Sequence, residues 1–163
     1  MFAFTMNKTK KPEITSEKIG LNPFLGKLEI PVNRVTYEKQ YEKDVDGHWL
    51  PVQKELEASR HCKIYVSKEN RLNMMKLSAR AIDLFLWIVY ESENSCEWIW
   101  VNKKRYMEER GVVSINTYKG ALVELIKAGY LISSVIKDVY WINPDYFFNG
   151  NRVSVFPKNV VRK

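Results

Sequence analysis

The chain has 163 residues, of which 45% are apolar, and 5 Trp, 9 Tyr and 7 Phe supply bulky side chains for a core. This composition excludes an intrinsically disordered chain and indicates one folded domain, alone or with an appendage. The net charge is +7, and residues 103–163 hold 11 Lys/Arg against 5 Asp/Glu, a net of +6. This localised excess favours an anionic partner, nucleic acid first and an anionic membrane surface second.

Cysteine usage and hydrophobic runs indicate the compartment. The two cysteines, Cys62 and Cys96, form no disulfide framework. Residues 1–6 are too short for the apolar core of a signal peptide, and the apolar run Ala81–Tyr90 is too short to span a bilayer. We therefore expect a cytoplasmic protein with free thiols and no membrane association.

The first 76 residues carry weak patterns. Residues 1–26 are punctuated by Pro and Gly and predict an extended basic arm, whose lysines at 8, 10 and 11 either touch phosphates or, as we favour, are simply solvated. Residues 27–67 show short alternating runs with a hairpin turn at Asp46-Gly47, which predicts a small antiparallel sheet. Residues 68–76 are polar and are expected to connect this region to the next domain.

Residues 78–92 predict the central helix of that domain. Ser78 is a suitable N-cap, and apolar side chains cover nearly the whole circumference, which is typical of a buried helix. A short strand, Trp98–Val101, is expected to follow. Asn102 then predicts the start of a helix over Lys103–Arg110, with Gly111 as its C-terminal stop.

The stretch Ser114–Leu131 predicts an amphipathic helix. The hydroxyl of Ser114 can accept from the amide of Thr117, and Gly129 can end the helix in a left-handed conformation. The residues at helical spacing on its apolar face are Tyr118, Ala121, Leu122, Leu125 and Ile126. Those on its outer face are Asn116, Lys119, Gly120, Val123 and Lys127. With no acid before Glu124, this outer face suits a DNA major groove, although any amphipathic helix on a core shows the same periodicity.

The order of predicted elements is helix, short strand, helix, tight turn, helix and two-stranded hairpin. The hairpin strands are 131–136 and 139–143, with Lys137 and Asp138 at the turn. This is the order of a winged helix-turn-helix, in which the third helix lies in the major groove and the hairpin forms the wing. We predict an α+β protein with such a domain over residues 77–152, a small N-terminal antiparallel β appendage, and a basic C-terminal tail over 153–163.

Two segments of the chain resemble known sequences. Ser114, Thr117-Tyr118, Leu122, Glu124-Leu-Ile126 and Gly129-Tyr-Leu131 resemble a pattern common in winged helix-turn-helix regulators and initiators. The stretch Tyr140-Trp-Ile-Asn-Pro-Asp-Tyr-Phe-Phe-Asn-Gly150 resembles the segment after the wing in RepL-type plasmid replication proteins. The resemblance covers about half the chain and implies a DNA-binding domain used in replication of a plasmid or phage-like element.

The residues of that second stretch also have a physical interpretation. Asn143 can cap a short helix, and Pro144 fits its first position, where no amide donor is needed. We expect this helix to fold its aromatic residues, Tyr146, Phe147 and Phe148, onto the core as a packing lid.

The chain carries no recognisable catalytic or metal-binding pattern. His48, His61, Cys62 and Cys96 match no zinc-finger or zinc-ribbon spacing. No phosphate-binding glycine loop, nucleophile elbow or His-x-His metal pair is present. We therefore expect no enzymatic activity, no cofactor and no metal.

The expected function is sequence-specific binding of double-stranded DNA in replication initiation or copy control. The alternatives are a transcriptional regulator, and a structural or protein-interaction component that kept the fold without DNA binding. The expected partners are DNA and either a second copy of the chain or a protein of the replication machinery. The expected DNA-binding residues are Asn116, Thr117 and Lys119 toward bases, and Lys103, Lys104, Arg105 and Lys137 toward phosphates.

Overall fold

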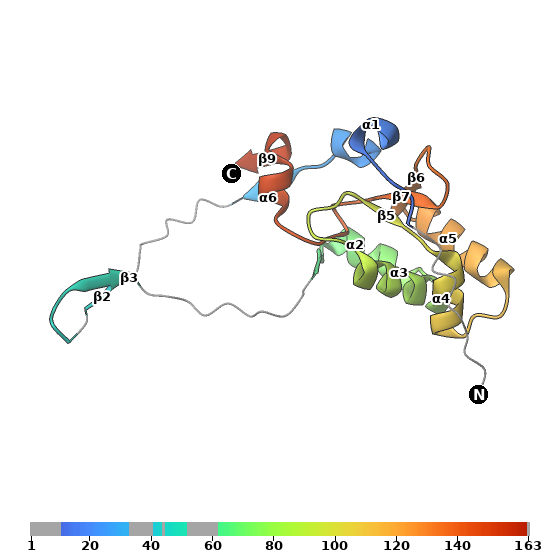
Figure 1. The fold of residues 1–163 in the computed structure, drawn as a ribbon, viewed down its shortest axis with the longest axis horizontal. Coiled ribbons are helices and arrows are strands. Elements are labelled where there is room, and N and C mark those ends of the chain that lie inside the picture. Colours follow the sequence, from blue (N-terminus) through green and yellow to red (C-terminus); the bar gives the residue numbers. More distant parts are fainter. Residues whose placement is uncertain (1–10, 33–40, 44, 52–61, 163) are drawn as a thin grey trace.

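The computed structural model describes residues 11–32, 41–43, 45–51 and 62–162, and within them the fold is mixed α+β with small sheets (Figure 1). The helices are α1 Ser16–Ile19, α2 Lys68–Met75, α3 Ala79–Glu91, α4 Lys103–Arg110, α5 Ile115–Lys127 and α6 Arg152–Val155, with 3-10 turns η1 Pro23–Gly26 and η2 Pro157–Asn159. The strands are β1 Ile30–Val32, β2 Tyr41–Lys43, β3 Trp49–Pro51, β4 Lys63–Ile64, β5 Trp98–Trp100, β6 Leu131–Ser133, β7 Val139–Ile142, β8 Phe147–Phe148 and β9 Val160–Arg162. No described helix is long and apolar enough to cross a membrane.

Helix α3 is the centre of the main core, as its sequence predicts. Ser78 caps it by accepting from the amide of Ala81, and the buried side chains follow around the helix. Phe85 meets the rings of Tyr130 and Phe147 edge to face, at centroid distances of 5.0 and 5.2 Å. Burial of this aromatic cluster stabilises the packing of α3 against the elements that follow it.

Helices α4 and α5 begin and end at the residues that the sequence indicates. The side chain of Asn102 accepts from the amide of Arg105, and Gly111 ends α4 with φ +62°. Ser114 caps α5, although its hydroxyl accepts from the amide of Asn116 and not from Thr117 as predicted. Gly129, with φ +79°, follows the end of α5. The left-handed conformation of both glycines is one that side chains disfavour.

The predicted hairpin is confirmed and belongs to a three-stranded sheet. Strands β6 and β7 pair antiparallel, and β5 pairs with the other edge of β7, giving the order β5-β7-β6. The amide of Val139 donates to the carbonyl of Ile136 at 3.2 Å, and Asp138 adopts φ +58° at the turn. The carbonyl of Asp138 also accepts from the amide of Val101, which ties the turn to the segment that leads into α4.

The N-terminal segment is not an extended arm where the structure describes it. Residues 11–26 contain α1 and η1 and pack against the β5-β7-β6 sheet, where Ile19 is buried with Val139 and Trp141. The side chain of Asn22 is also buried and donates to the carbonyl of Ile142 at 3.1 Å. Apolar spacing at 14, 19 and 24 gives no helical or strand period, which is why the prediction failed; the lysines at 8 and 10 lie outside the described residues.

The C-terminal segment is also folded and is not a basic tail. Strand β9 pairs in parallel with β1, in the register Ile30 to Val160. Beneath this pair, Phe156 and Phe148 form a second small core with Leu28 and Ile30. The side-chain amide of Asn159 donates to the carbonyls of Leu25 and Leu28, which fixes the C-terminal segment to the end of η1 and the residues that lead into β1.

The described strands between residues 27 and 67 do not form one sheet. Among them, β2 and β3 make the predicted antiparallel hairpin, whereas β1 pairs with β9 and β4 pairs with β8. The expected connection at 68–76 contains helix α2, capped by Ser67. The expected short helix near Pro144 is instead a turn followed by β8, because the backbone of 147–148 pairs with β4. Both phenylalanines of β8 are fully buried, so their packing role is confirmed.

Candidate nucleic-acid interface

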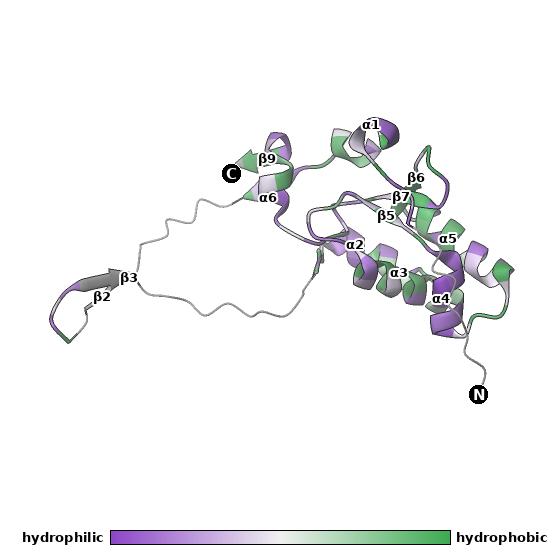
Figure 2. Cartoon of the chain, in the orientation of Figure 1, coloured by the Kyte–Doolittle hydropathy of each residue, from purple (hydrophilic) through white to green (hydrophobic). Residues whose placement is uncertain are grey.

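Helix α5 presents two distinct faces. Its buried face contains Tyr118, Ala121, Leu122 and Leu125 and packs into the main core. The five residues of its outer face, Asn116, Lys119, Gly120, Val123 and Lys127, are all exposed. This surface consists of two bases, an amide, a glycine without a side chain and the exposed Val123. Figure 2 shows both hydrophilic and hydrophobic residues along the ribbon of α5, as expected for a helix with two faces.

A hollow of about 430 Å³ separates the start of α3 from α5. The residues that line it are Ser78, Ala79, Arg80, Asn116, Thr117, Gly120, Ala121 and Glu124. A Cβ placed on Gly120 would meet no atom within 4 Å, so this wall of the hollow is open. We call this feature the α3–α5 hollow. It brings the predicted base-reading residues Asn116 and Thr117 beside Arg80, an exposed cation.

Arg80 is a candidate that the sequence did not reveal. Its position on the polar side of the first turn of α3 predicts exposure, but not a neighbour. Only the packing of α3 against α5 places it at the hollow. A guanidinium at this edge adds a charged, planar donor group to the surface of α5.

Glu124 is the acidic residue that lines the α3–α5 hollow. One carboxylate oxygen accepts from the amide of Ser78 at 2.6 Å, and the other accepts from its hydroxyl at 2.7 Å. These hydrogen bonds hold the pKa of Glu124 below its usual range. The charge of Glu124 is therefore engaged with the start of α3, where the helix dipole favours an anion.

The three basic residues at the start of α4 have different surroundings. Arg105 donates two hydrogen bonds to Glu91, at 2.7 and 2.9 Å, and its Nε donates to Glu109 at 2.6 Å. Glu109, with Glu91, raises the pKa of Arg105 above its ordinary value. The guanidinium also lies over the ring of Trp87, 6.0 Å from its centroid. The structure therefore places Arg105 between α3 and α4, within an ion-pair network.

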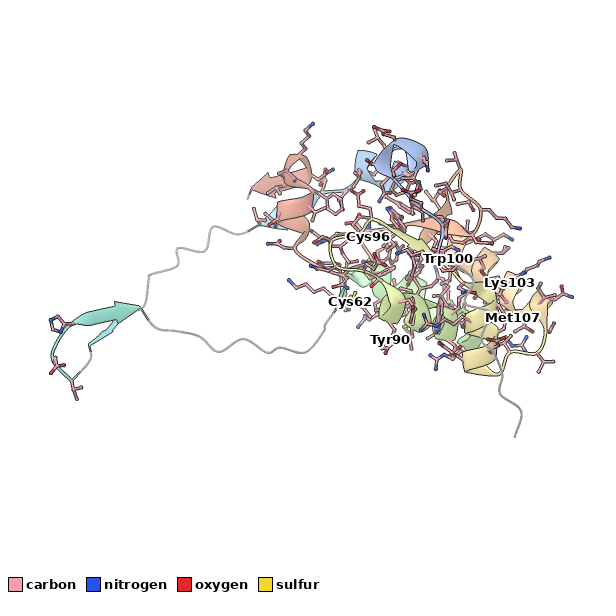
Figure 3. The ribbon with its side chains drawn as sticks, viewed as in Figure 1. Cys62, Tyr90, Cys96, Trp100, Lys103 and Met107 are labelled. Carbon is pink, nitrogen blue, oxygen red and sulfur yellow. The ribbon has the colours of Figure 1, made fainter. Side chains whose placement is uncertain are left out.

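The side chains of Lys103 and Lys104 are less engaged with other protein groups than the side chain of Arg105. Both are exposed, and among the described residues Lys104 makes a single, long ion pair, 3.8 Å, with Glu108 one turn further along α4. Figure 3 labels Lys103 on α4 together with Met107, whose side chain packs against the main core. The helix thus turns its Met107 side inward and its first lysines toward solvent.

Lys137 lies at the tip of the β6–β7 hairpin and is exposed. Its neighbour Asp138 is half-buried, and its charge acts on two buried tyrosines. Burial, then the nearby Tyr140 and Asp138, raises the pKa of Tyr118. Burial and Asp138 likewise raise the pKa of Tyr140. The turn therefore carries an exposed base next to a half-buried acid.

The predicted site residues fall into three groups. Asn116 and Thr117 share the α3–α5 hollow, and Lys119 lies on the outer face of the same helix. The basic residues of α4 are joined to α5 by the short turn at 111–114. Lys137 stands apart on the hairpin.

Metal and thiol chemistry find little support in the part of the chain that the structure describes. No group of three or more His, Cys, Asp or Glu could hold a metal ion there. Cys62 and Cys96 are both half-buried and are not joined by a disulfide in the described structure, and burial raises the pKa of Cys96. His61, one of the residues considered for zinc, lies outside the described ranges.

In comparisons with known proteins, the chain matches no family model, no curated protein and no solved structure.

Proposed function

We propose that this protein binds double-stranded DNA sequence-specifically, through a winged helix-turn-helix formed by residues 77–152. Helices α3, α4 and α5 would be its three helices, and the β6–β7 hairpin its wing. The observation that carries the proposal is the outer face of α5, which is exposed, basic and free of acids except at Glu124, itself held by Ser78. A DNA major groove, about 12 Å wide, admits one α-helix of this kind.

The first turns of α5 would read bases. Asn116 is exposed at the second position of the helix, and an Asn side chain pairs bidentately with adenine. Thr117 and Lys119 lie within the same turn, where the hydroxyl and the ammonium extend the donor set. In helix-turn-helix proteins it is this N-terminal part of the third helix that approaches base edges.

Phosphate contacts would come from the cations around α5. Lys103, Lys104 and Lys137 are exposed on α4 and on the hairpin, and Arg80 borders the α3–α5 hollow. Phosphate contacts position a protein on the duplex and carry no sequence information directly. Arg105 takes a different role in this scheme, because its donors are occupied by Glu91 and Glu109.

The biological role that we propose is replication initiation or copy control of a plasmid or phage-like element. Its support is the resemblance of Tyr140–Gly150 to the segment after the wing in RepL-type proteins. A transcriptional regulator would use the same surface. Deletion of the gene distinguishes the two: an initiator is needed for replication of its element, whereas a regulator changes only transcript levels.

The test compares Asn116→Ala with Lys137→Ala on two duplexes. One is enriched by the wild-type protein from a random-sequence library and is called the enriched duplex; the other is a scrambled version. Asn116→Ala should weaken binding to the enriched duplex by about 1–3 kcal/mol and leave scrambled binding nearly unchanged. Lys137→Ala should weaken both by a similar factor and flatten the slope of log K against log salt by about one unit.

Lys158→Ala is the matched control. It removes the same charge from η2, between α6 and β9, and Figure 1 shows α6 and β9 well separated from α4 and α5. It should change neither the affinity nor the salt slope. If Asn116→Ala and Lys137→Ala lose affinity equally on both duplexes, α5 is not the reading helix and the proposed docking is wrong.

A further inference from the structure

The start of α3 has an unusual arrangement of caps. In a capping box, the N-cap serine accepts from the amide of the third helical residue, and a Glu or Gln at that third position accepts from the N-cap amide. Ser78 makes the first of these bonds, with Ala81 at 3.2 Å. Ala81 is fully buried and carries no acceptor, so it cannot make the second.

A residue of another helix makes the missing bond. Glu124 of α5, 46 residues further along the chain, accepts hydrogen bonds from both the amide and the hydroxyl of Ser78. Its carboxylate occupies the place that a glutamate at the third position of α3 would take, and it completes the cap of that helix.

We propose that Ser78 and Glu124 form a capping box split between two helices, which sets the rotation of α5 and so positions Asn116 for DNA recognition. This inference rests on the proposed function. Glu124 and Asn116 are eight residues apart, about two turns, so they lie on one side of α5 and both line the α3–α5 hollow.

The hydrogen bonds between Ser78 and Glu124 fix the rotation of α5, which its apolar core contacts do not. Leu122 and Leu125 hold the helix in place by apolar burial, which has no directional preference. Hydrogen bonds lose most of their strength when the donor angle is poor. A rotation of α5 that displaced Asn116 would also break both bonds from Ser78 to Glu124. The same pairing keeps a carboxylate on the flank of the proposed DNA surface engaged with protein donors.

The experiment is a double-mutant cycle of Ser78→Ala and Glu124→Ala, which removes the acceptor altogether, read as affinity for the enriched and the scrambled duplex. Each single variant should lose roughly tenfold in affinity for the enriched duplex, a size within the range expected when the base contact of Asn116 is misplaced. Neither should lose affinity for the scrambled duplex. The double variant should lose no more than either single variant, because both changes break one unit. Ser78→Thr, which keeps the hydroxyl, should restore selectivity.

Glu108→Ala is the matched control. It removes one carboxylate side chain from an exposed position on α4, where it makes a long ion pair with Lys104, and so reproduces the change in net charge away from Ser78. It should leave selectivity between the two duplexes intact. All affinities are measured well below the melting temperature of the least stable variant, with the folded fraction checked by circular dichroism.

Two outcomes separate this inference from the proposed function. If the wild-type protein does not distinguish the duplexes, the proposed function fails and the inference with it. If the wild type discriminates, and Ser78→Ala and Glu124→Ala lower the melting temperature but keep full selectivity, the pair is a helix cap only and the positioning role is overturned.

Discussion

The clearest consequence of the structure is that Lys103 and Arg105, two residues apart on α4, should behave differently when each is replaced by alanine. Lys103 is exposed at the start of the helix, whereas Arg105 contacts Glu91, Glu109 and Trp87. The sequence alone predicts that both residues contact phosphates. The geometry instead predicts that Lys103→Ala affects DNA binding and that Arg105→Ala affects stability.

The magnitude for Arg105→Ala follows from its contacts. The side chain of Arg105 is 49% exposed, and those of Glu91 and Glu109 are 20% and 42% exposed, so solvent screens both ion pairs in part. Each such pair contributes about 0.2–1 kcal/mol, and a partly exposed cation–π contact about 0.5–1 kcal/mol. The expected loss in the free energy of unfolding is therefore about 1–3 kcal/mol, with no change in the salt dependence of DNA binding.

Lys103→Ala should give the reverse result. Removing one phosphate contact flattens the slope of log K against log salt by about 0.9. The free energy of unfolding should stay within about 0.5 kcal/mol of wild type, as for most surface substitutions. Urea denaturation and binding isotherms at several salt concentrations measure the two quantities on the same samples.

One result would refute this reasoning. If Arg105→Ala flattens the salt slope by a full unit and leaves stability unchanged, then Arg105 leaves its carboxylates to contact phosphate. The network between α3 and α4 would not describe the protein when it binds DNA.

Three further predictions concern the core, pH and metals. Trp87→Ala should lower the free energy of unfolding, measured by urea denaturation, by about 3–5 kcal/mol. The reason is that Trp87 is 4% exposed, packs edge to face on Tyr106 and donates a hydrogen bond to Glu109. A variant as stable as wild type would mean that α3 is not the buried centre of the core. The pKa of Glu124 is lowered in the folded state. Its ionised carboxylate therefore contributes to the free energy of unfolding above its ordinary pKa of 4.5, and this contribution is lost as pH falls through the lower folded value. The difference in the free energy of unfolding between wild type and Glu124→Gln should therefore be constant above about pH 5 and shrink below it. The other charged group that lines the hollow is Arg80. A difference that widens in acid would contradict the stabilising role of the Glu124 carboxylate. Chelator and reductant should leave the melting temperature and DNA affinity unchanged, and a sharp drop with EDTA would reveal a metal site.

The elements with local signals could be predicted from the sequence. Ser78, Asn102 and Ser114 cap α3, α4 and α5, and Gly111 and Gly129 mark two of the ends. Caps of this kind act within a few residues, so the sequence contains the whole signal. The β6–β7 hairpin is local in the same sense.

The elements without local signals could not be predicted. Strands β1 and β9 pair between Ile30 and Val160, and nothing near either residue indicates a partner 130 residues away (160 − 30). The two-residue strand β8 forms because β4 pairs with it, against a local pattern that suits a helix start. The apolar side chains of α2 do not fall on one face of the helix, so helical periodicity does not predict it. The local feature that indicates its start is the Ser67 cap.

The candidate site shows the same division. Exposure of Asn116 and Lys119 follows from the period of one helix, and the structure confirms it. The neighbours Arg80 and Ser78 come from α3, and their placement beside α5 depends on how two helices pack. Sequence periodicity gives the face of a helix but not the residues of another helix that lie against it.

The most direct test of the central claim is whether the wild-type protein selects a DNA sequence. The measurement is its affinity for the enriched duplex and for the scrambled duplex, at two salt concentrations. The account predicts tighter binding to the enriched duplex at both, with affinities that fall steeply with salt; about five phosphate contacts give a slope near −4 to −5. Equal affinity for the two duplexes, or binding that does not depend on salt, would contradict it.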